Sequence, residues 1–461
     1  QQGTTEVKYR LRLWVDESYN PQNDNGGLIY KVKVNVYGQT SDTVAQVEDT
    51  YCKDNGFTKL SDCMLVMNNH EASADVAGAA IIAKGTPNFA KIAPNSDETD
   101  GVYAAEDDDG TSYYYRGAVR NNYVSFAGFM WRIIRRNGDG SIRLIYSGKN
   151  TSDTGTAVTI GNSQYNNKYW DPTYVGYKYN EKFSLHENNG TTGYNWFTNT
   201  QKYNYGTGYS FDESTKKFTL TGDIQQLTWK DNHDEIVKNN LYSCLNTSCN
   251  VVYKVTGYQN ETTMTVQPIS YSSDSYADAV TNTTNSSIKT TLDTWYKNNM
   301  TAYTSYLADT TFCNDRSVTS GSGYLTTPTT YGAYGRLLSR RAPSLKCAQN
   351  NDKFTLTNES AKLDYPVSLI TADEASMAGG VVGVANSNYY LYNGQYTWTL
   401  SPSDFSSNYS NAYVWSVTPS GGLNHWNGVT NSFGVRPVVN LKADTLITKG
   451  DGTSLNPYVV K

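Results

Sequence analysis

The stretch from residue 364 to residue 441 constrains the fold of this chain more than any other part of the sequence. It consists of short runs of β-branched and aromatic residues that Pro, Gly, Asn and Ser interrupt at near-regular spacing. Three of these runs cover residues 396–402, 412–419 and 434–441. Such spacing is typical of short strands joined by surface loops. The stretch therefore predicts a compact, strand-rich module with long loops.

The composition favours a secreted or cell-surface protein with more than one domain. At 461 residues the chain is too long for one ordinary domain, and its length predicts about two to four. Hydrophobic residues make up 38% and charged residues 18%, both below the averages of soluble proteins. Asn, Ser, Thr, Gly and Tyr fill the difference, as is common on extracellular proteins. The 39 Tyr against 12 Phe suit either half-buried strands alone or a surface that contacts a partner.

The charge and hydropathy patterns argue against two classes of partner. The net charge is −5 and no basic stripe stands out, so we expect no nucleic-acid partner. No run approaches 18 apolar residues, so we expect no membrane span in these residues. The chain starts at Gln1, without an initiator Met or a signal peptide, and we expect a processed product or a fragment of a longer precursor.

The cysteines predict disulfides in an oxidising compartment. An even number at short spacing favours bridges between neighbours, although six cysteines allow 15 pairings. Zinc binding is disfavoured, because neither a CxxC motif nor a Cys/His cluster is present. Nine Asn-X-Ser/Thr sequons also fit an exterior location. The neighbouring pairs are Cys52 with Cys63, Cys244 with Cys249, and Cys313 with Cys347.

The first 39 residues predict a β-hairpin. Apolar and polar residues alternate over residues 5–15 and again over 30–36, on either side of a loop rich in Asn, Asp and Gly. An isolated two-stranded hairpin is marginally stable in water, so its apolar face needs more sheet. The hairpin either packs on later strands of its own chain or completes a sheet in a neighbouring subunit by β-strand addition. The apolar face consists of Val7, Tyr9, Leu11, Leu13, Val15, Tyr30, Val32, Val34 and Val36.

The predicted fold class is α+β and predominantly β. Residues 40–100 predict a helical linker region, with helices over 41–51 and 60–83. Residues 101–461 predict a strand-rich surface body that includes a C-terminal module at about 361–461.

The start of this body reads as strands and tight turns. The runs 113–119, 124–135 and 141–146 predict strands, and the sequence Asn-Gly-Asp-Gly at 137–140 predicts a tight turn. The acidic turn at Asp107 to Asp109 could hold calcium through its carboxylates. It lacks the regular ligand spacing of a calcium loop, however, so a solvated turn is the favoured interpretation.

Three further elements are predicted in the rest of the body. Residues 286–316 have helical spacing that closes on Cys313, and a shorter helix is expected at 233–242. Thr371 is expected to cap a helix that begins with Ala-Asp-Glu-Ala. The tail at 446–460 predicts a final hairpin.

Four runs resemble an uncharacterised family of cell-surface proteins from gut Firmicutes. They are EDDDGTSYYYRGAV at 106–119, FMWRIIRRNGDGSIR at 129–143, YPVSLITADEA at 365–375 and GVRPVVNLK at 434–442. With the GDGTS tail, the resemblance spans residues 101–461. It implies an exterior location and carries no known activity.

Two other resemblances concern the ends of the chain. The Trp415-Ser run together with Gly434-Val-Arg-Pro resembles the last strands of C-type-lectin-like folds, including formylglycine-generating enzymes. The paired active-site cysteines of those enzymes have no counterpart here. The N-terminal hairpin resembles the last two strands of the TasA/camelysin type of secreted β-sandwich. That type builds extracellular fibres by donating a strand to the next subunit.

The sequence offers little chemistry for catalysis. A Ser/His/Asp triad needs a well-placed histidine, and we expect His70, His186 and His233 to be exposed side chains. Asp373 and Glu374 are adjacent at a helix start, so capping explains them better than paired acid catalysis. No phosphate-binding glycine motif lies between a strand and a helix.

One segment could bind a ligand. Asn424, His425, Trp426 and Asn427 are expected in an exposed loop, where a sugar ring could stack on Trp426 and the amides could bind its hydroxyls. An ordinary Gly/Asn loop with one packed Trp explains these residues as well.

These patterns predict a non-enzymatic extracellular protein without cofactor or metal, a subunit of a surface filament or pilus-like fibre that is assembled from copies of itself. The alternative is a monomeric lectin-like adhesin that binds glycans or a host surface protein. A secreted hydrolase is the third and weakest hypothesis.

Overall fold

The computed structural model describes residues 52, 56–69, 85–93, 102–169, 171–180, 275–324, 327–409 and 411–461, with the strands of one further sheet between 195 and 269. The chain divides into two compact units, Gln1–Gln46 and Val47–Lys461. The predicted N-terminal hairpin, with all nine residues of its apolar face, lies outside the described residues. The helix expected over 41–51 also lies there, as do residues 70–83 of the helix expected over 60–83 and residues 233–241 of the one expected over 233–242. The described start of the second helix is confirmed as α2 (Leu60–Asn69), and Tyr242 instead begins a strand. Within the described part, strands are many and helices are few and short, which confirms the α+β, predominantly β class.

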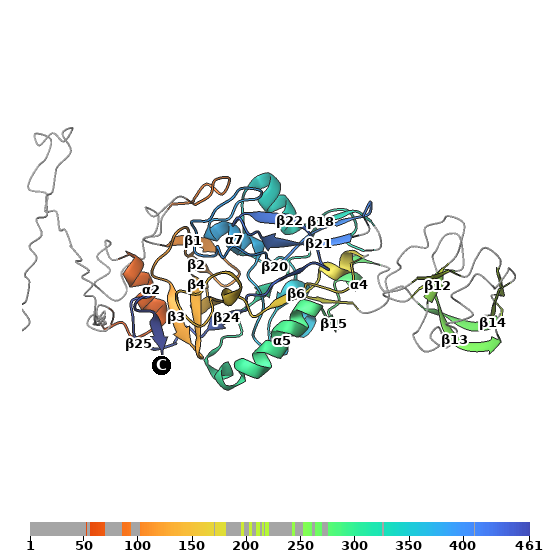
Figure 1. Cartoon of the computed structure of the whole chain (residues 1–461), viewed down its shortest axis with the longest axis horizontal. Helices are drawn as coiled ribbons and strands as arrows, with labels where there is room; N and C mark the ends of the chain where they lie inside the picture. Colours follow the sequence, from red (N-terminus) through yellow and green to blue (C-terminus); the bar gives the residue numbers. More distant parts are fainter. Residues whose placement is uncertain are drawn as a thin grey trace, which may run out of the picture. The chain divides into compact units, whose positions relative to one another are not determined.

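The first sheet of the body is built around β4 (Phe129–Arg136) (Figure 1). Its neighbours β2, β3 and β5 all pair with it in antiparallel fashion. The end of the chain joins the same sheet, because β24 pairs with β5 and β26 runs parallel to β3. The other strands are β1 (Tyr103–Glu106), β2 (Thr111–Tyr114), β3 (Tyr123–Phe126), β5 (Ile142–Tyr146), β24 (Val438–Leu441), β25 (Ile447–Lys449) and β26 (Tyr458–Val460).

Two turns set the register of this sheet. The strand expected over 124–135 is in fact the hairpin β3–β4, which turns at Ala127 (φ 54°) and Gly128 (φ 78°). Two successive positive φ angles match the twist of a two-residue hairpin, but alanine rarely adopts them, so the sequence did not reveal the turn. The second turn is confirmed, since Asn137 N–H donates to the carbonyl of Ser141 at 2.8 Å.

The second sheet contains the strands expected in the C-terminal stretch. β20 lies at its centre, with β18 and β21 antiparallel and β23 parallel to it. β23 also pairs with β6, a strand from the first third of the body. The strands are β6 (Asn162–Gln164), β17 (Val318–Ser320), β18 (Thr329–Tyr331), β20 (Thr397–Ser406), β21 (Asn411–Val417), β22 (Leu423–Gly428) and β23 (Ser432–Gly434).

Both sheets contribute to one hydrophobic core. Trp131 of the first sheet and Trp398 and Trp415 of the second are each at most 1% exposed and belong to the same cluster of buried side chains. Large aromatic side chains dominate core energetics because each removes some 150–250 Å² from water. Residues 361–461 therefore share their core with residues 102–180.

Helix α5 (Ser287–Asn299) covers part of this core. Ser286 caps it by accepting from the N–H of Lys289, and Ile288, Leu292 and Tyr296 are buried on one face at helical spacing. The helix expected to reach Cys313 was predicted too long. The chain continues in a 3₁₀ helix (Thr301–Tyr306), and β16 (Phe312–Cys313) pairs with β19 (Lys353–Phe354).

The capped helix predicted after Thr371 is confirmed as α7 (Ala372–Ala378). Thr371 and Glu374 form a reciprocal capping box. The remaining short elements are α4 (Tyr276–Ala279), α6 (Gly332–Tyr334), a π-helix (Gly335–Arg340), and 3₁₀ helices at Gly155–Val158, Pro172–Val175, Asn350–Asp352 and Glu359–Ala361.

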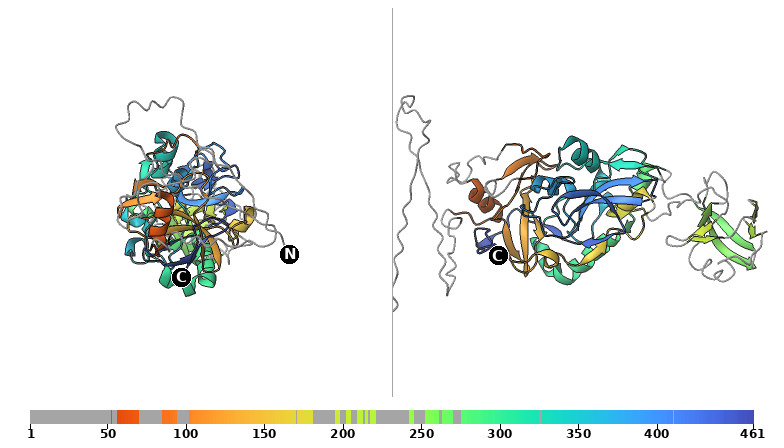
Figure 2. Two further views of the ribbon diagram at one scale, coloured as in Figure 1. Left: turned by 90° about the vertical axis from the view of Figure 1, so that its left-hand side faces the viewer. Right: turned by 45° about the horizontal axis from the view of Figure 1, so that its top comes forward.

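Helix α2 (Leu60–Asn69) and the C-terminal hairpin lie side by side (Figures 1 and 2). The predicted final hairpin is confirmed as β25 paired with β26. Lys59 bridges to Leu446, and the N–H of Leu60 donates to the carbonyl of Thr445 at 2.9 Å. None of the helices in the described ranges has the length and apolar character needed to cross a lipid bilayer.

A third sheet is inserted into the body. Its seven strands run in the order β10-β11-β14-β13-β12-β8-β9. The chain leaves for this sheet after β7 (Lys178–Tyr179) and returns before β15 (Thr284–Asn285), and these two strands pair with each other. Residues 181–274 therefore form an insertion whose two ends are close together. Its strands are β8 (Asn195–Phe197), β9 (Lys202–Asn204), β10 (Tyr209–Asp212), β11 (Lys217–Leu220), β12 (Tyr242–Cys244), β13 (Val252–Asn260) and β14 (Thr263–Ile269).

Candidate functional site

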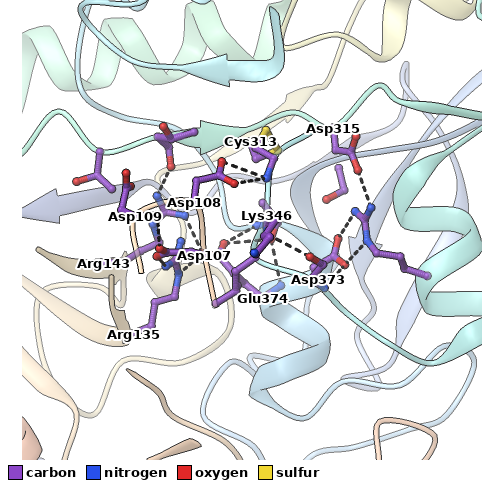
Figure 3. A pocket seen from close by; sticks show the side chains of 18 residues that line it. Asp107, Asp108, Asp109, Arg135, Arg143, Cys313, Asp315, Lys346, Asp373 and Glu374 are labelled. Carbon is purple, nitrogen blue, oxygen red and sulfur yellow. Dashed lines mark hydrogen bonds and ion pairs between the residues drawn. A yellow bond between two sulfur atoms is a disulfide. The ribbon is translucent and has the colours of Figure 1, made fainter. Parts of the chain in front are cut away.

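A small charged pocket lies where the acidic turn meets the start of α7 (Figure 3). Its wall is formed by residues 107–109, by the segments 310–315 and 344–347, and by the first turn of α7. Arg135 and Arg143 enter it from β4 and β5. Its volume of about 30 Å³ leaves space for little more than one or two water molecules.

Glu374 is the most buried carboxylate of the pocket. Its side chain is 2% exposed, and its Oε1 accepts from Arg143 Nη1 at 2.7 Å and from Arg135 Nε at 2.9 Å. Its other oxygen accepts from the N–H of Thr371 at 2.9 Å, within the capping box. Burial alone would raise the pKa of Glu374, but the two guanidinium groups and the Thr371 hydrogen bond lower it to about 2. Glu374 is therefore ionised and fully paired at neutral pH.

Asp107 also pairs with Arg135, from the side opposite Glu374. Its Oδ2 accepts from Arg135 Nη1 at 2.8 Å, from Ser112 Oγ at 2.6 Å and from the N–H of Gly138 at 2.9 Å. Burial opposes ionisation, but the hydrogen bonds from Ser112, Gly138 and Asp109 together with the charge of Arg135 lower the pKa of Asp107. A Cβ at position 138 would lie 2.3 Å from Asp107 Oδ1, so this turn requires glycine for close approach.

The acidic turn predicted at Asp107 to Asp109 is thus a structural contact. Asp108 pairs with Lys353 at 3.0 Å and accepts from the N–H of Cys347. Asp109 is exposed, and partial burial followed by repulsion from Asp107, Asp139 and Asp108 raises its pKa. No three His, Cys, Asp or Glu residues in the described part of the chain are arranged to hold a metal ion. The calcium interpretation therefore gains no support.

A third arginine, Arg336, also lines the pocket. Arg336, from the π-helix, binds Asp315 through Nη1 at 2.7 Å and Asp373 through Nε at 2.8 Å. Burial alone would lower the pKa of Arg336, but the charges and hydrogen bonds of Asp373 and Asp315 raise it. Asp373 also accepts from the N–H of Ser344 at 2.9 Å, which attaches the segment 344–347 to α7.

The paired charges of the pocket have a structural role. Its buried carboxylates all accept from guanidinium groups and backbone N–H groups, so they are not available as a general base or as a nucleophile. The capping role predicted for Glu374 is confirmed. Its ion pairs to Arg135 and Arg143 were missed, because one sequence gives no sign that residues more than 200 positions apart will meet.

The ligand loop predicted at residues 424–427 is instead part of β22, the last strand of the second sheet. Asn427 is 5% exposed and donates from Nδ2 to Ser416 Oγ at 2.7 Å, so its amide is buried and already hydrogen-bonded within the sheet. Asn424 accepts from the N–H of Trp426 at 2.9 Å. Trp426 itself is 68% exposed.

His425 is the one histidine within the described ranges. Its ring packs against Tyr334 (5.1 Å between centroids) and Trp415 (5.4 Å). Its Nδ1 lies 4.0 Å from Asp404 Oδ1, which is too far for a hydrogen bond. His70, His186 and His233 lie outside the described residues.

Two of the three expected disulfides are present. Cys52 is bonded to Cys63, and Cys313 is bonded to Cys347. The second of these bridges lines the charged pocket (Figure 3). The pairing expected between Cys244 and Cys249 involves Cys249, which lies outside the described residues.

Comparison with known proteins returned no match of any kind. No protein-family model, no curated protein and no solved structure matches this chain.

Proposed function

We propose that this protein is a non-enzymatic extracellular structural protein, a subunit of a bacterial surface filament. In this filament the hairpin at residues 1–39 of one copy completes a sheet of the next copy. One observation carries the proposal: residues 5–15 and 30–36 alternate apolar and polar side chains, which predicts a hairpin with one continuous apolar face. A hairpin with nine apolar residues on one face is marginal alone, so that face needs a partner.

The attachment of α2 supports this role. Cys52, close to the division between the two units, is bonded to Cys63 inside α2. The residues around α2 are fastened to the C-terminal end of the chain, where Ser61 Oγ donates to the carbonyl of Ala443 at 3.1 Å. The disulfide-bonded segment is therefore anchored beside the hairpin β25–β26, which belongs to the first sheet. The disulfides and the paired charges of the pocket suit a rigid building block in an oxidising environment.

Substitutions on the two faces of the hairpin test the proposal. Val34→Asp places a charge on the apolar face, and its neighbour Asn35→Asp adds the same charge on the polar face. We expect the unmodified chain and Asn35→Asp to sediment as large assemblies, and Val34→Asp to sediment as a monomer with an unchanged melting temperature. A monomeric unmodified chain would contradict the proposal. A Val34→Asp variant that melts earlier as a monomer would show that the hairpin packs within its own chain.

A lectin-like adhesin is the second candidate, and the exposure of Trp426 favours it. An indole ring that is 68% exposed can stack on a sugar ring without any rearrangement. On a glycan array, we expect Trp426→Ala to abolish binding if this candidate holds. Tyr409→Ala is the matched control, because Tyr409 is 76% exposed. Equal loss in both variants, or no binding by the unmodified chain, would reject the adhesin.

A further inference from the structure

A pair of basic residues, one exposed and one half-buried, lies at the end of the π-helix. Ser339, Arg340 and Ala342 are exposed, and Arg341 is half-buried. Arg340 and Arg341 make no ion pair with any described residue. By contrast, the pair Arg135 and Arg136 lies inside β4, where both residues pair with neighbouring strands. The segment around Arg341 therefore differs from that other arginine pair in being accessible from solvent.

The backbone around this pair is the end of a short π-helix, which has to open locally before a protease can bind it. A peptide bond is cleaved when several residues on either side can adopt an extended conformation, and exposed irregular loops meet this condition most easily. Residues 341–349 contain no helix or strand. Arg341 has φ 51°, a left-handed conformation that disfavours any continuation of the helix. The N–H groups of Arg341 and Ala342 both donate to the carbonyl of Arg336 and end the π-helix. Once these two bonds open, the nearest fixed points are the buried side chain of Leu337 upstream and the N–H of Ser344 downstream. Six residues, 338–343, lie between these anchors.

Both sides of this segment stay attached if the chain is cut. Upstream, Arg336 is held by Asp315 and Asp373. Downstream, Ser344 is hydrogen-bonded to the same Asp373, and Cys347 is bonded to Cys313. The disulfide encloses the basic pair, so the two fragments would remain covalently linked.

We propose that the Arg341–Ala342 peptide bond is a processing site for a trypsin-like protease. Hydrolysis adds the hydroxyl of water to the Arg341 carbonyl carbon and transfers the proton to the Ala342 nitrogen as the bond breaks. The product is a two-chain body whose parts, ending at Arg341 and starting at Ala342, are joined by the Cys313–Cys347 disulfide. Arg341 provides the basic side chain that a trypsin-like protease needs on the N-terminal side of the cleaved bond. Arg340 supplies a second positive charge for an acidic subsite of the protease.

Limited digestion of the full chain with trypsin tests this inference. We expect a fragment with the new N-terminus Ala342 among the first products of the body, released on gels only after reduction. Because the readout is this one terminus, cleavage in other segments does not affect it. Arg340→Gln/Arg341→Gln is expected to slow its appearance at least tenfold. Lys346→Gln, which removes an exposed basic residue on the same segment, leaves it unchanged.

Two results would overturn the inference. One is a body that is cut first at Lys346 or within a strand, with the Arg341–Ala342 bond intact. The other is a 342–461 fragment that separates without reduction. The melting temperature of the nicked protein adds an independent check, because a cut between two anchored segments should leave it within a few degrees of the intact chain.

Discussion

Glu374 on helix α7 and Arg143 on strand β5 form a buried ion pair, with 2.7 Å between Oε1 and Nη1. The same carboxylate oxygen also accepts from Arg135 on β4. One acidic side chain thus joins α7 to two neighbouring strands of the first sheet. Because the pair is buried, removing Glu374 would leave Arg143 without its ion-pair partner and Arg135 with Asp107 alone.

Glu374→Gln should destabilise the body strongly. The substitution leaves Arg135 and Arg143 buried without their shared carboxylate, a change that costs about 3–5 kcal/mol. Urea unfolding at pH 7 measures it. Glu359→Gln is the matched control, because Glu359 forms an exposed ion pair with Lys362 and should change the unfolding free energy by less than about 1 kcal/mol. Equal effects of both substitutions would show that the Glu374 network contributes no more than a surface pair.

The same carboxylate should make stability depend on pH. The pKa of Glu374 is lowered from 4.5 to about 2 in the folded protein, so its contribution is complete above pH 4.5 and is lost as the pH falls towards 2. A shift of this size corresponds to about 3 kcal/mol. We therefore expect the difference in unfolding free energy between the unmodified chain and Glu374→Gln to shrink as the pH falls from 5 to 2. A difference that stays constant over this range would contradict the assignment.

The Cys313–Cys347 disulfide should stabilise the body by constraining its unfolded state. The bond closes a sequence separation of 34 residues, for which the chain-entropy model gives about 4 kcal/mol. Replacing both cysteines by Ala should lower the unfolding free energy by about that amount. Replacing Cys52 and Cys63, which are separated by 11 residues, should lower it by about 3 kcal/mol. A larger loss for the shorter loop would show that local strain or packing, and not loop length, decides the effect.

The insertion at 181–274 should be removable. Its two ends meet where Tyr179 pairs with Thr284, and the N–H of Thr283 donates to the carbonyl of Tyr179 at 3.1 Å. A short Gly/Ser linker can close this gap at small entropic cost. We expect a chain without residues 181–274 to be folded and to melt cooperatively within a few degrees of the full chain. A loss of cooperative melting would show that the insertion is part of the body's core.

The sequence predicted local features well and long-range contacts poorly. Thr371 and Glu374 are three residues apart, so a capping box is visible in the chain itself. Arg135 ends a predicted strand, and it is nevertheless only 5% exposed, because its charge is matched by Asp107 and by the distant Glu374. β22 was read as a loop because Asn, His and Gly have low strand propensity, and pairing with β21 outweighs that preference.

Two of the disulfides could be predicted from the sequence for the same reason as the capping box. Short sequence separation makes them good candidates for bridges. The ends of the insertion were missed, because the pairing of β7 with β15 spans more than 100 residues and involves only two residues on each side. The role of the N-terminal hairpin stays a prediction, since residues 1–51 lie outside the described part of the chain.

Negative-stain electron microscopy of the full chain tests the central claim most directly. At high protein concentration we expect linear assemblies of repeated units, and we expect a chain without residues 1–39 to give only single particles. Single particles from the full chain at every concentration would contradict the filament. Assemblies that persist without residues 1–39 would show that another surface joins the subunits.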